Sequence, residues 1–145
     1  YLLFTMEFYQ IIAEKLKPNG ILIVQSGPAS MSENDAFTSI CNTLSKVFSL
    51  VFPYVAYIPS YALPWGFSLA THNPSNLDIS GDEIDARIHS GITGQLRFYD
   101  SITHHALFNL PKYLRADIQK QQRVIKDIDP LKEHYPGISA ESTNP

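Results

Sequence analysis

Gln25 is the polar side chain best placed to hold a ligand. It follows residues 21–24, a wholly apolar and mostly β-branched run. Such a run is typical of a strand that is buried on both faces in a sheet covered by helices. Ligands of open α/β sheets gather at the carboxyl ends of the strands, which is where Gln25 would lie. Its amide could donate and accept hydrogen bonds there, although a glutamine at a strand end often bonds only to the backbone.

The other reactive residues have simpler structural interpretations. Cys41 is the only cysteine, which excludes an intramolecular disulfide framework and a paired-cysteine metal site. It falls within a predicted amphipathic helix, so we interpret it as a packed thiol. His104 and His105 have no carboxylate or cysteine at a metal-ligand spacing, and we interpret them as a solvated or capping pair. Glu83 and Asp85 fit a solvated helix face, so no metal site is predicted.

Apolar residues at helical spacing predict two amphipathic helices, one before and one after this strand in the sequence. The first ends at the Pro-Asn-Gly of residues 18–20, which tolerates the positive φ of a helix terminus. The second begins with Ser32 as its N-cap, because Glu33 and Asp35 suit a first turn. The apolar stripes are Phe8, Ile11, Ile12 and Leu16 in the first helix, and Phe37, Ile40, Leu44, Val47 and Phe48 in the second.

Residues 50–58 and 65–71 predict two further strands with a proline-rich break between them. Proline lacks the N–H that a sheet ladder needs, so residues 59–64 are expected to turn. Two successive strands with no helix between them are most simply antiparallel. The predicted fold class is therefore α/β, with a sheet that ends in an antiparallel hairpin.

Two more helices are predicted after the hairpin. Ser80 with Glu83 three residues later forms a capping box, which starts a short helix through Ile88. A further helix is predicted near residues 113–122. From residue 126 the chain is polar and contains prolines, so we expect a loosely ordered tail over residues 126–145.

The composition favours an ordered domain. A hydrophobic fraction of 44% is enough to build a core, and a net charge of −3 disfavours a nucleic-acid partner. No apolar run approaches the roughly 20 residues that span a bilayer, and no basic-then-apolar leader opens the chain. We therefore expect a cytoplasmic protein without a membrane partner. An apolar opening without methionine suggests a domain of a longer polypeptide.

Four stretches, taken together, resemble a known enzyme family. The more specific pair is residues 20–29, Gly-Ile-Leu-Ile-Val-Gln-Ser-Gly-Pro-Ala, and residues 53–67, where Pro-Ser-Tyr is followed by Trp-Gly-Phe. The weaker pair is residues 3–9 and residues 96–111. In this order they resemble the polyamine aminopropyltransferases of the spermidine/spermine synthase family, and most of all the thermospermine synthase branch. The resemblance implies the carboxyl-terminal half of a Rossmann-like, methyltransferase-type sheet, and it assigns residues 1–125 to the catalytic domain.

The resemblance implies transfer of an aminopropyl group from decarboxylated S-adenosylmethionine to a polyamine, with release of methylthioadenosine. By the same resemblance, Gln25 and Tyr61 would contact the acceptor amine. Trp65 would line its groove, and Tyr57 is a further candidate for the same role. The donor is a sulfonium whose reactive carbon is already activated, so no metal or other cofactor is expected. The acceptor amine has a pKa of about 10, and a carboxylate base is suited to remove its proton.

The resemblance places the glycine-rich donor loop, the acidic residue for the donor ribose and the aspartate base upstream of Tyr1. We therefore assign no catalytic or cofactor-binding residue within the chain and expect this fragment to be inactive by itself. The full-length enzyme would form a dimer or tetramer. The acceptor stays open between putrescine, which gives spermidine, and spermidine, which gives spermine or thermospermine. Two alternatives also stay open: a non-catalytic oligomerisation or interaction domain, and a fragment of a small-molecule methyltransferase that uses S-adenosylmethionine.

Overall fold

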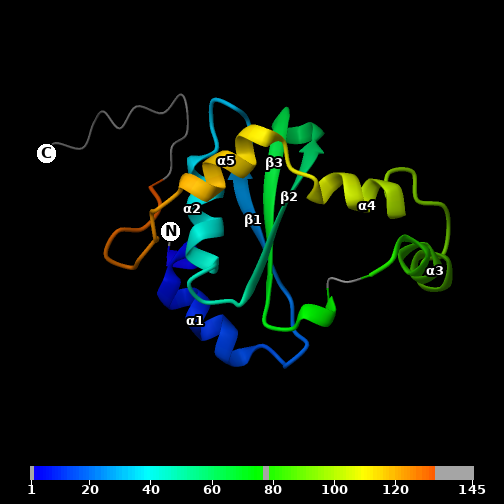
Figure 1. The fold of residues 1–145 in the computed structure, drawn as a ribbon, viewed down its shortest axis with the longest axis horizontal. Helices are drawn as coiled ribbons and strands as arrows, with labels where there is room; N and C mark the ends of the chain where they lie inside the picture. Colours follow the sequence, from blue (N-terminus) through cyan, green and yellow to red (C-terminus); the bar gives the residue numbers. More distant parts are fainter. Residues whose placement is uncertain (1, 77–78, 133–145) are drawn as a thin grey trace, which may run out of the picture.

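A three-stranded sheet forms the centre of the molecule, and helices surround it (Figure 1). The computed structural model describes residues 2–76 and 79–132. The strands are β1 (Leu22–Pro28), β2 (Leu50–Ile58) and β3 (Leu63–Thr71), in the order β1-β3-β2. The central strand β3 is antiparallel to both of its neighbours. The predicted α/β class with an antiparallel hairpin is confirmed.

The hairpin of β2 and β3 turns at a short 3-10 segment, η2 (Pro59–Tyr61). Ala62 follows it with a φ of 56°, in the left-handed region, and this residue reverses the chain into β3. Pairing runs without a shift from Leu50 opposite Thr71 to Ile58 opposite Leu63. Of the two prolines in the predicted break, Pro59 begins the turn and Pro64 is the second residue of β3. The turn therefore lies where the sequence predicts it.

β1 is buried on one face only, so the prediction of a strand covered on both faces is wrong. Val24 and Ser26 are buried, whereas Gln25 is exposed and Ile23 is 56% exposed. The helix α2 (Asp35–Leu44) packs on the buried face, with α1 (Met6–Lys15) beside it. An apolar run records that a strand is hydrophobic, but it does not specify what covers the second face.

Two clusters of buried side chains hold the helices to the sheet. The first joins α1 and α2 to β1 and to the carboxyl-terminal end of β3. The second joins α2 to α5 (Lys112–Lys120) near the end of β1. Their buried members are Tyr9, Val24, Ile40, Leu44, Phe48, Ala70 and Ile125 in the first cluster, and Ala29, Phe37, Cys41, Leu110 and Leu114 in the second.

Asn34 is the N-cap of α2, so the predicted start at Ser32 is wrong. The amide of Ser30 donates to the carbonyl of Glu33 at 3.1 Å, and the amide of Glu33 donates to the carbonyl of Ser30 at 3.4 Å. This closed turn delays the helix. The Asn34 side chain makes no capping bond, and its Nδ2 donates instead to Asp117 of α5 at 3.0 Å.

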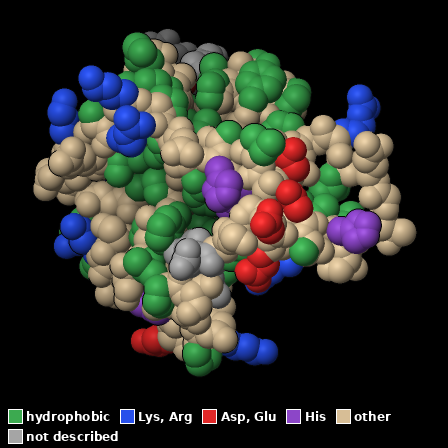
Figure 2. Space-filling view, turned by 45° about the vertical axis from the view of Figure 1, so that its right-hand side comes forward, with side chains coloured by type: hydrophobic (Ala, Val, Ile, Leu, Met, Phe, Trp, Pro, Cys, Tyr) green, Lys and Arg blue, Asp and Glu red, His purple; other side chains and the backbone are tan. Residues whose placement is uncertain are grey.

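Helices α3 (Gly81–Gly91) and α4 (Ser101–Phe108) extend to one side of the sheet (Figure 1). The Ser80 hydroxyl caps α3 by accepting from the Glu83 amide at 3.2 Å, as predicted. α4 was not predicted, because its sequence has no clear helical periodicity, and Asp100 caps it. Figure 2 turns this side of the molecule toward the viewer. Acidic side chains gather there in one part of the surface, beside hydrophobic side chains. No described helix is long and apolar enough to cross a membrane.

The chain contacts the core on both sides of the predicted start of the tail at residue 126. Ile125 is fully buried, its carbonyl accepts from the amide of Met6 at 2.8 Å, and its amide donates to the Thr43 hydroxyl at 3.0 Å. Leu131 packs against the first cluster. The remainder of the predicted tail, residues 133–145, lies outside the described residues.

Candidate functional site

The structure brings Gln25, Tyr61 and Trp65 together. The Gln25 Nε2 donates to the Tyr61 Oη at 3.3 Å, across 36 residues of sequence. The ring centroids of Tyr61 and Trp65 lie 4.3 Å apart at 42°. An amide, a phenol and an indole from β1, η2 and β3 therefore form one group.

Sheet register explains why these side chains share a face. Gln25 lies opposite Phe67 on β3, and Trp65 is two residues before Phe67, so alternation places all three on one side. The other side of β3 faces α2, since the ring of Phe37 lies against Gly66. The left-handed turn at Ala62 then brings Tyr61 back over Trp65.

A cavity of about 350 Å³ is lined by two members of this group, Gln25 and Trp65, and it reaches to α2. Small-molecule sites commonly occupy roughly 300–1,000 Å³. The indole Nε1 of Trp65 is buried and has no hydrogen-bond partner among the described residues, so it could donate to a ligand. The cavity is lined by Phe4, Gln25, Ser26, Gly27, Ala36, Ile40, Trp65 and Leu131.

Tyr57 does not join the group. Its neighbour Ala56 is the β2 partner of Trp65, and successive side chains of a strand point to opposite faces. Tyr57 therefore points away from Trp65, and its side chain is 60% exposed. The predicted contribution of Tyr57 to the groove is wrong for this reason.

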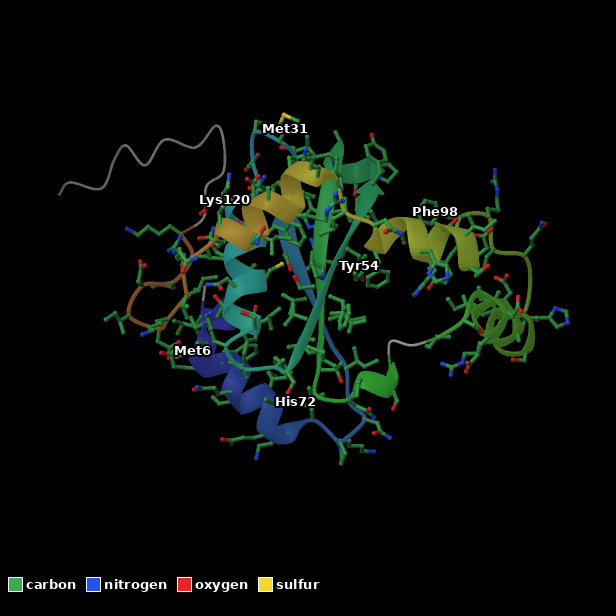
Figure 3. All side chains as sticks on the ribbon, viewed as in Figure 1. Met6, Met31, Tyr54, His72, Phe98 and Lys120 are labelled. Carbon is green, nitrogen blue, oxygen red and sulfur yellow. The ribbon has the colours of Figure 1, made fainter. Side chains whose placement is uncertain are left out.

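An aromatic cluster that the sequence did not predict lies between β2 and α4. Tyr54 stacks on Phe67 with ring centroids 5.2 Å apart, and its ring lies 5.0 Å from that of Phe108. Figure 3 labels Tyr54 on β2, near the end of α4. Burial, with a smaller effect of Tyr99, raises the pKa of Tyr54. The cluster continues the aromatic face of Phe67 away from Gln25.

The histidine pair makes contacts within this same region. The Tyr99 Oη lies 2.6 Å from the His104 Nδ1, and the His104 ring also packs on His105 and Phe108. Burial first, and the neighbouring His105 second, lower the pKa of His104. Among residues 2–76 and 79–132, no three His, Cys, Asp or Glu side chains gather into a group that could hold a metal ion.

The two acidic residues of α3 differ in role. Glu83 pairs with Arg87 at 2.5 Å on an exposed face, as a solvated helix face would. Asp85 accepts from the amide and the hydroxyl of Ser101, at 2.9 and 2.6 Å, and thus links α3 to α4. The sequence did not predict this link, because Ser101 belongs to the helix that it missed.

A larger cavity, of about 670 Å³, shares Ala36 and Leu131 with the smaller one. Its charged lining is mostly acidic and includes Glu33, Asp35, Asp117 and Asp129. Arg123 lies among them, 3.9 Å from Asp35 and 3.5 Å from Asp129. These carboxylates come from three separate segments, so no sequence spacing could have grouped them.

The family model described as "Spermine/spermidine synthase domain" matches residues 2–79. The chain belongs to this family. The matched segment includes Gln25, Tyr61 and Trp65, the three side chains that the fold brings together. The family resemblance expected from the sequence is confirmed.

Curated relatives include aminopropyltransferases from archaea and plants. The chain is 38% identical over 130 residues to a polyamine aminopropyltransferase of Sulfolobus acidocaldarius, covering 90% of this chain and 43% of that protein. It is 34% identical over 141 residues to thermospermine synthase ACAULIS5 of Arabidopsis thaliana, covering 96% of this chain and 41% of that protein. The chain thus spans about two fifths of the length of these relatives.

Solved spermidine synthases share the fold. A crystal structure of spermidine synthase from Thermotoga maritima superposes with a TM-score of 0.69 at 22% identity, over 82% of this chain and 40% of that one. A spermidine synthase structure in complex with the transition state analogue AdoDATO gives the same values. At this identity the likeness shows the fold alone.

Proposed function

We propose that this chain supplies the amine-binding side of a polyamine aminopropyltransferase. The reaction is transfer of an aminopropyl group from decarboxylated S-adenosylmethionine to a polyamine, with methylthioadenosine as the other product. The observation that carries the proposal is the 3.3 Å contact between Gln25 and Tyr61, with Trp65 beside it, inside the segment that matches the family.

The chemistry assigns a role to each side chain. The acceptor must present a lone pair, yet an alkyl ammonium with a pKa near about 10 is mostly protonated at neutral pH. The Gln25 amide uses its nitrogen toward Tyr61, which leaves the carbonyl oxygen of the same amide to accept an N–H of the acceptor. The Tyr61 oxygen can accept a second N–H. Together they hold the nitrogen in line with the carbon that it attacks.

Trp65 is proposed to line the groove. Its indole face suits a second ammonium of the polyamine through a cation–π contact, and its buried N–H can donate to a ligand. The exposed rim around the Gln25–Tyr61 pair leaves the site open to a charged, hydrated substrate.

Further parts of the proposal concern the whole enzyme. We expect it to be cytoplasmic, to work as a dimer or tetramer, and to need no metal or other cofactor, because the sulfonium donor is already activated. The family match over residues 2–79 favours aminopropyl transfer over a methyltransferase or a purely structural domain. Spermidine and putrescine both remain acceptor candidates.

Isothermal titration calorimetry tests the amine site directly. The full-length enzyme is titrated with spermidine and with putrescine while methylthioadenosine is present. Saturable heat is expected with at least one amine, and it should disappear in the Gln25→Ala, Tyr61→Phe double variant. Lack of saturable heat with both amines, from the folded full-length enzyme, would overturn the proposal.

A further inference from the structure

A line of three buried polar side chains runs beneath Gln25. The Ser26 Oγ lies 2.9 Å from the Ser68 Oγ, and the Ser68 Oγ lies 3.2 Å from the Cys41 Sγ. The Ser26 hydroxyl also donates to the Val24 carbonyl at 3.1 Å. Ser26 and Ser68 are 1% and 0% exposed, so water does not compete for these bonds.

Proton counting gives this line a direction. Ser26 has one hydroxyl proton, which goes to the Val24 carbonyl, so its oxygen must accept from Ser68. Ser68 then has no proton left and must accept from the Cys41 thiol. Burial raises the pKa of that thiol to about 11, so Cys41 is a protonated donor at neutral pH. The thiol therefore has a structural role, as its place in a helix predicts.

Ser26 also occupies an irregular position in the sheet. Gln25 pairs with Phe67 and Gly27 pairs with Gly66, so Ser26 is the extra residue of a β-bulge. Gly27 has a φ of 102°, which an L side chain rarely adopts. Bulges increase the local twist of a strand and re-aim neighbouring side chains. The side chain directly before this bulge is that of Gln25.

We propose that Ser26 and Ser68 are positioning residues, whose buried hydroxyl pair fixes the bulge and thereby turns Gln25 toward Tyr61. The inference rests on the proposed function, since it gives the hydroxyl pair a role in amine binding. The pair ties β1 to β3 one residue beyond Gln25, on the face of the sheet opposite to the amine site. Without it, the bulge is held by Gly27 alone and Gln25 samples other directions.

A double substitution separates positioning from stability. Replacing both hydroxyls by apolar groups leaves neither serine oxygen unsatisfied, and the Cys41 thiol that loses its acceptor is only a weak donor. Ser26→Ala with Ser68→Ala is therefore expected to cost little in folding stability. The chain also offers a matched control. Thr43→Val removes a different buried hydroxyl, which belongs to α2 and not to the bulge. That hydroxyl donates to the Ser39 carbonyl and accepts from the Ile125 amide.

Nuclear magnetic resonance on the whole chain measures the positioning without any ligand. Cross-relaxation between the Gln25 side-chain amide protons and the Tyr61 ring protons is expected in the unsubstituted chain and in Thr43→Val. It should be lost in the double alanine variant. Spermidine titration of the same samples should show affinity weakened by about fivefold to tenfold in the double variant, the loss expected when one hydrogen bond is misdirected.

The outcomes separate the two proposals. Unchanged cross-relaxation in the double variant overturns the positioning role, even if spermidine binds well. If spermidine binds to none of the samples, the proposed function fails, and cross-relaxation still decides whether the serines aim Gln25. Should the double variant not fold, Ser26→Ala by itself is used with the same two measurements, and the same results support or overturn the inference.

Discussion

The ring of Phe37 in α2 lies against the backbone of Gly66 in β3, so closely that a Cβ at position 66 would be 2.5 Å from a ring carbon. Phe37 is fully buried, and Gly66 is the β3 partner of Gly27 in the bulge. This one contact fixes the height of α2 above the sheet beside the strand ends that carry the candidate site.

Gly66→Ala is therefore expected to destabilise the fold. The added methyl group would overlap a buried ring, and such overpacking costs about 1–3 kcal/mol. Urea unfolding followed by circular dichroism measures the change. Gly91→Ala is the control, because nothing lies within 4 Å of a Cβ there, and it should leave the free energy of unfolding unchanged or slightly raised. Equal stabilities for the two variants would contradict the packing argument.

The sequence predicted the elements whose signals are local. The apolar run before Gln25, the prolines around Tyr61 and the Ser80 cap each act within a few residues, and each lies where expected. The start of α2 was misplaced, because a backbone turn between Ser30 and Glu33 delays it. Helix α4 was missed, because its stability depends on packing against β2 rather than on its own periodicity.

The site could be predicted only in part. Gln25 was chosen by its place at a strand end and by resemblance, and Tyr61 by resemblance alone. Their meeting depends on the register between strands that are far apart in sequence. The bulge that aims Gln25 depends on Ser68 and Cys41. Ser68 is 42 residues from Ser26 in the sequence, and Cys41 is 27 residues from Ser68. Such distant pairs leave no periodic pattern, so sequence reasoning could not find them.

The free energy of unfolding should depend on pH in the alkaline range because the Cys41 thiol is buried. Burial raises its pKa from 9.0 to about 11 in the folded chain. Below pH 9 both states hold the proton, so the stability does not change with pH through this thiol. Between about pH 9 and 11 only the unfolded chain loses the proton, so the free energy of unfolding falls with rising pH, by about 1.4 kcal/mol per unit at most.

Cys41→Ala is the variant that isolates this effect. Tyr9 and Tyr54 also have pKa values raised first by burial, and this effect of burial remains in the variant. Cys41 adds a smaller effect on Tyr9, which the variant removes together with the thiol. From pH 9 to pH 11, the free energy of unfolding of the unsubstituted chain should therefore fall by about 2–3 kcal/mol relative to that of Cys41→Ala. A difference that is constant with pH would contradict the buried, protonated thiol.

Asp85→Ala should loosen α3 from α4. The carboxylate is the acceptor of two hydrogen bonds from Ser101, and α3 contacts α4 more than any other helix or strand. Amide hydrogen exchange in α3 is expected to speed up about tenfold, while exchange in β3 stays the same, because the link stabilises one local unit. Asp82→Ala, in the first turn of the same helix, serves as control and should leave the α4 amides unchanged. Faster exchange throughout the sheet would show that α3 is not a separate unit.

Tyr61→Phe should weaken amine binding while leaving the fold intact. The substitution removes the hydroxyl that accepts from Gln25 and retains the ring that packs on Trp65. Loss of one positioned hydrogen bond is worth about 1–1.5 kcal/mol, which corresponds to about a tenfold weaker affinity for the acceptor amine. Tyr57→Phe is the matched control, since that phenol lies on the other face of β2 and is 60% exposed. Calorimetric titration should give unchanged affinity for Tyr57→Phe, and equal losses in both variants would contradict the assignment of Tyr61 to the amine site.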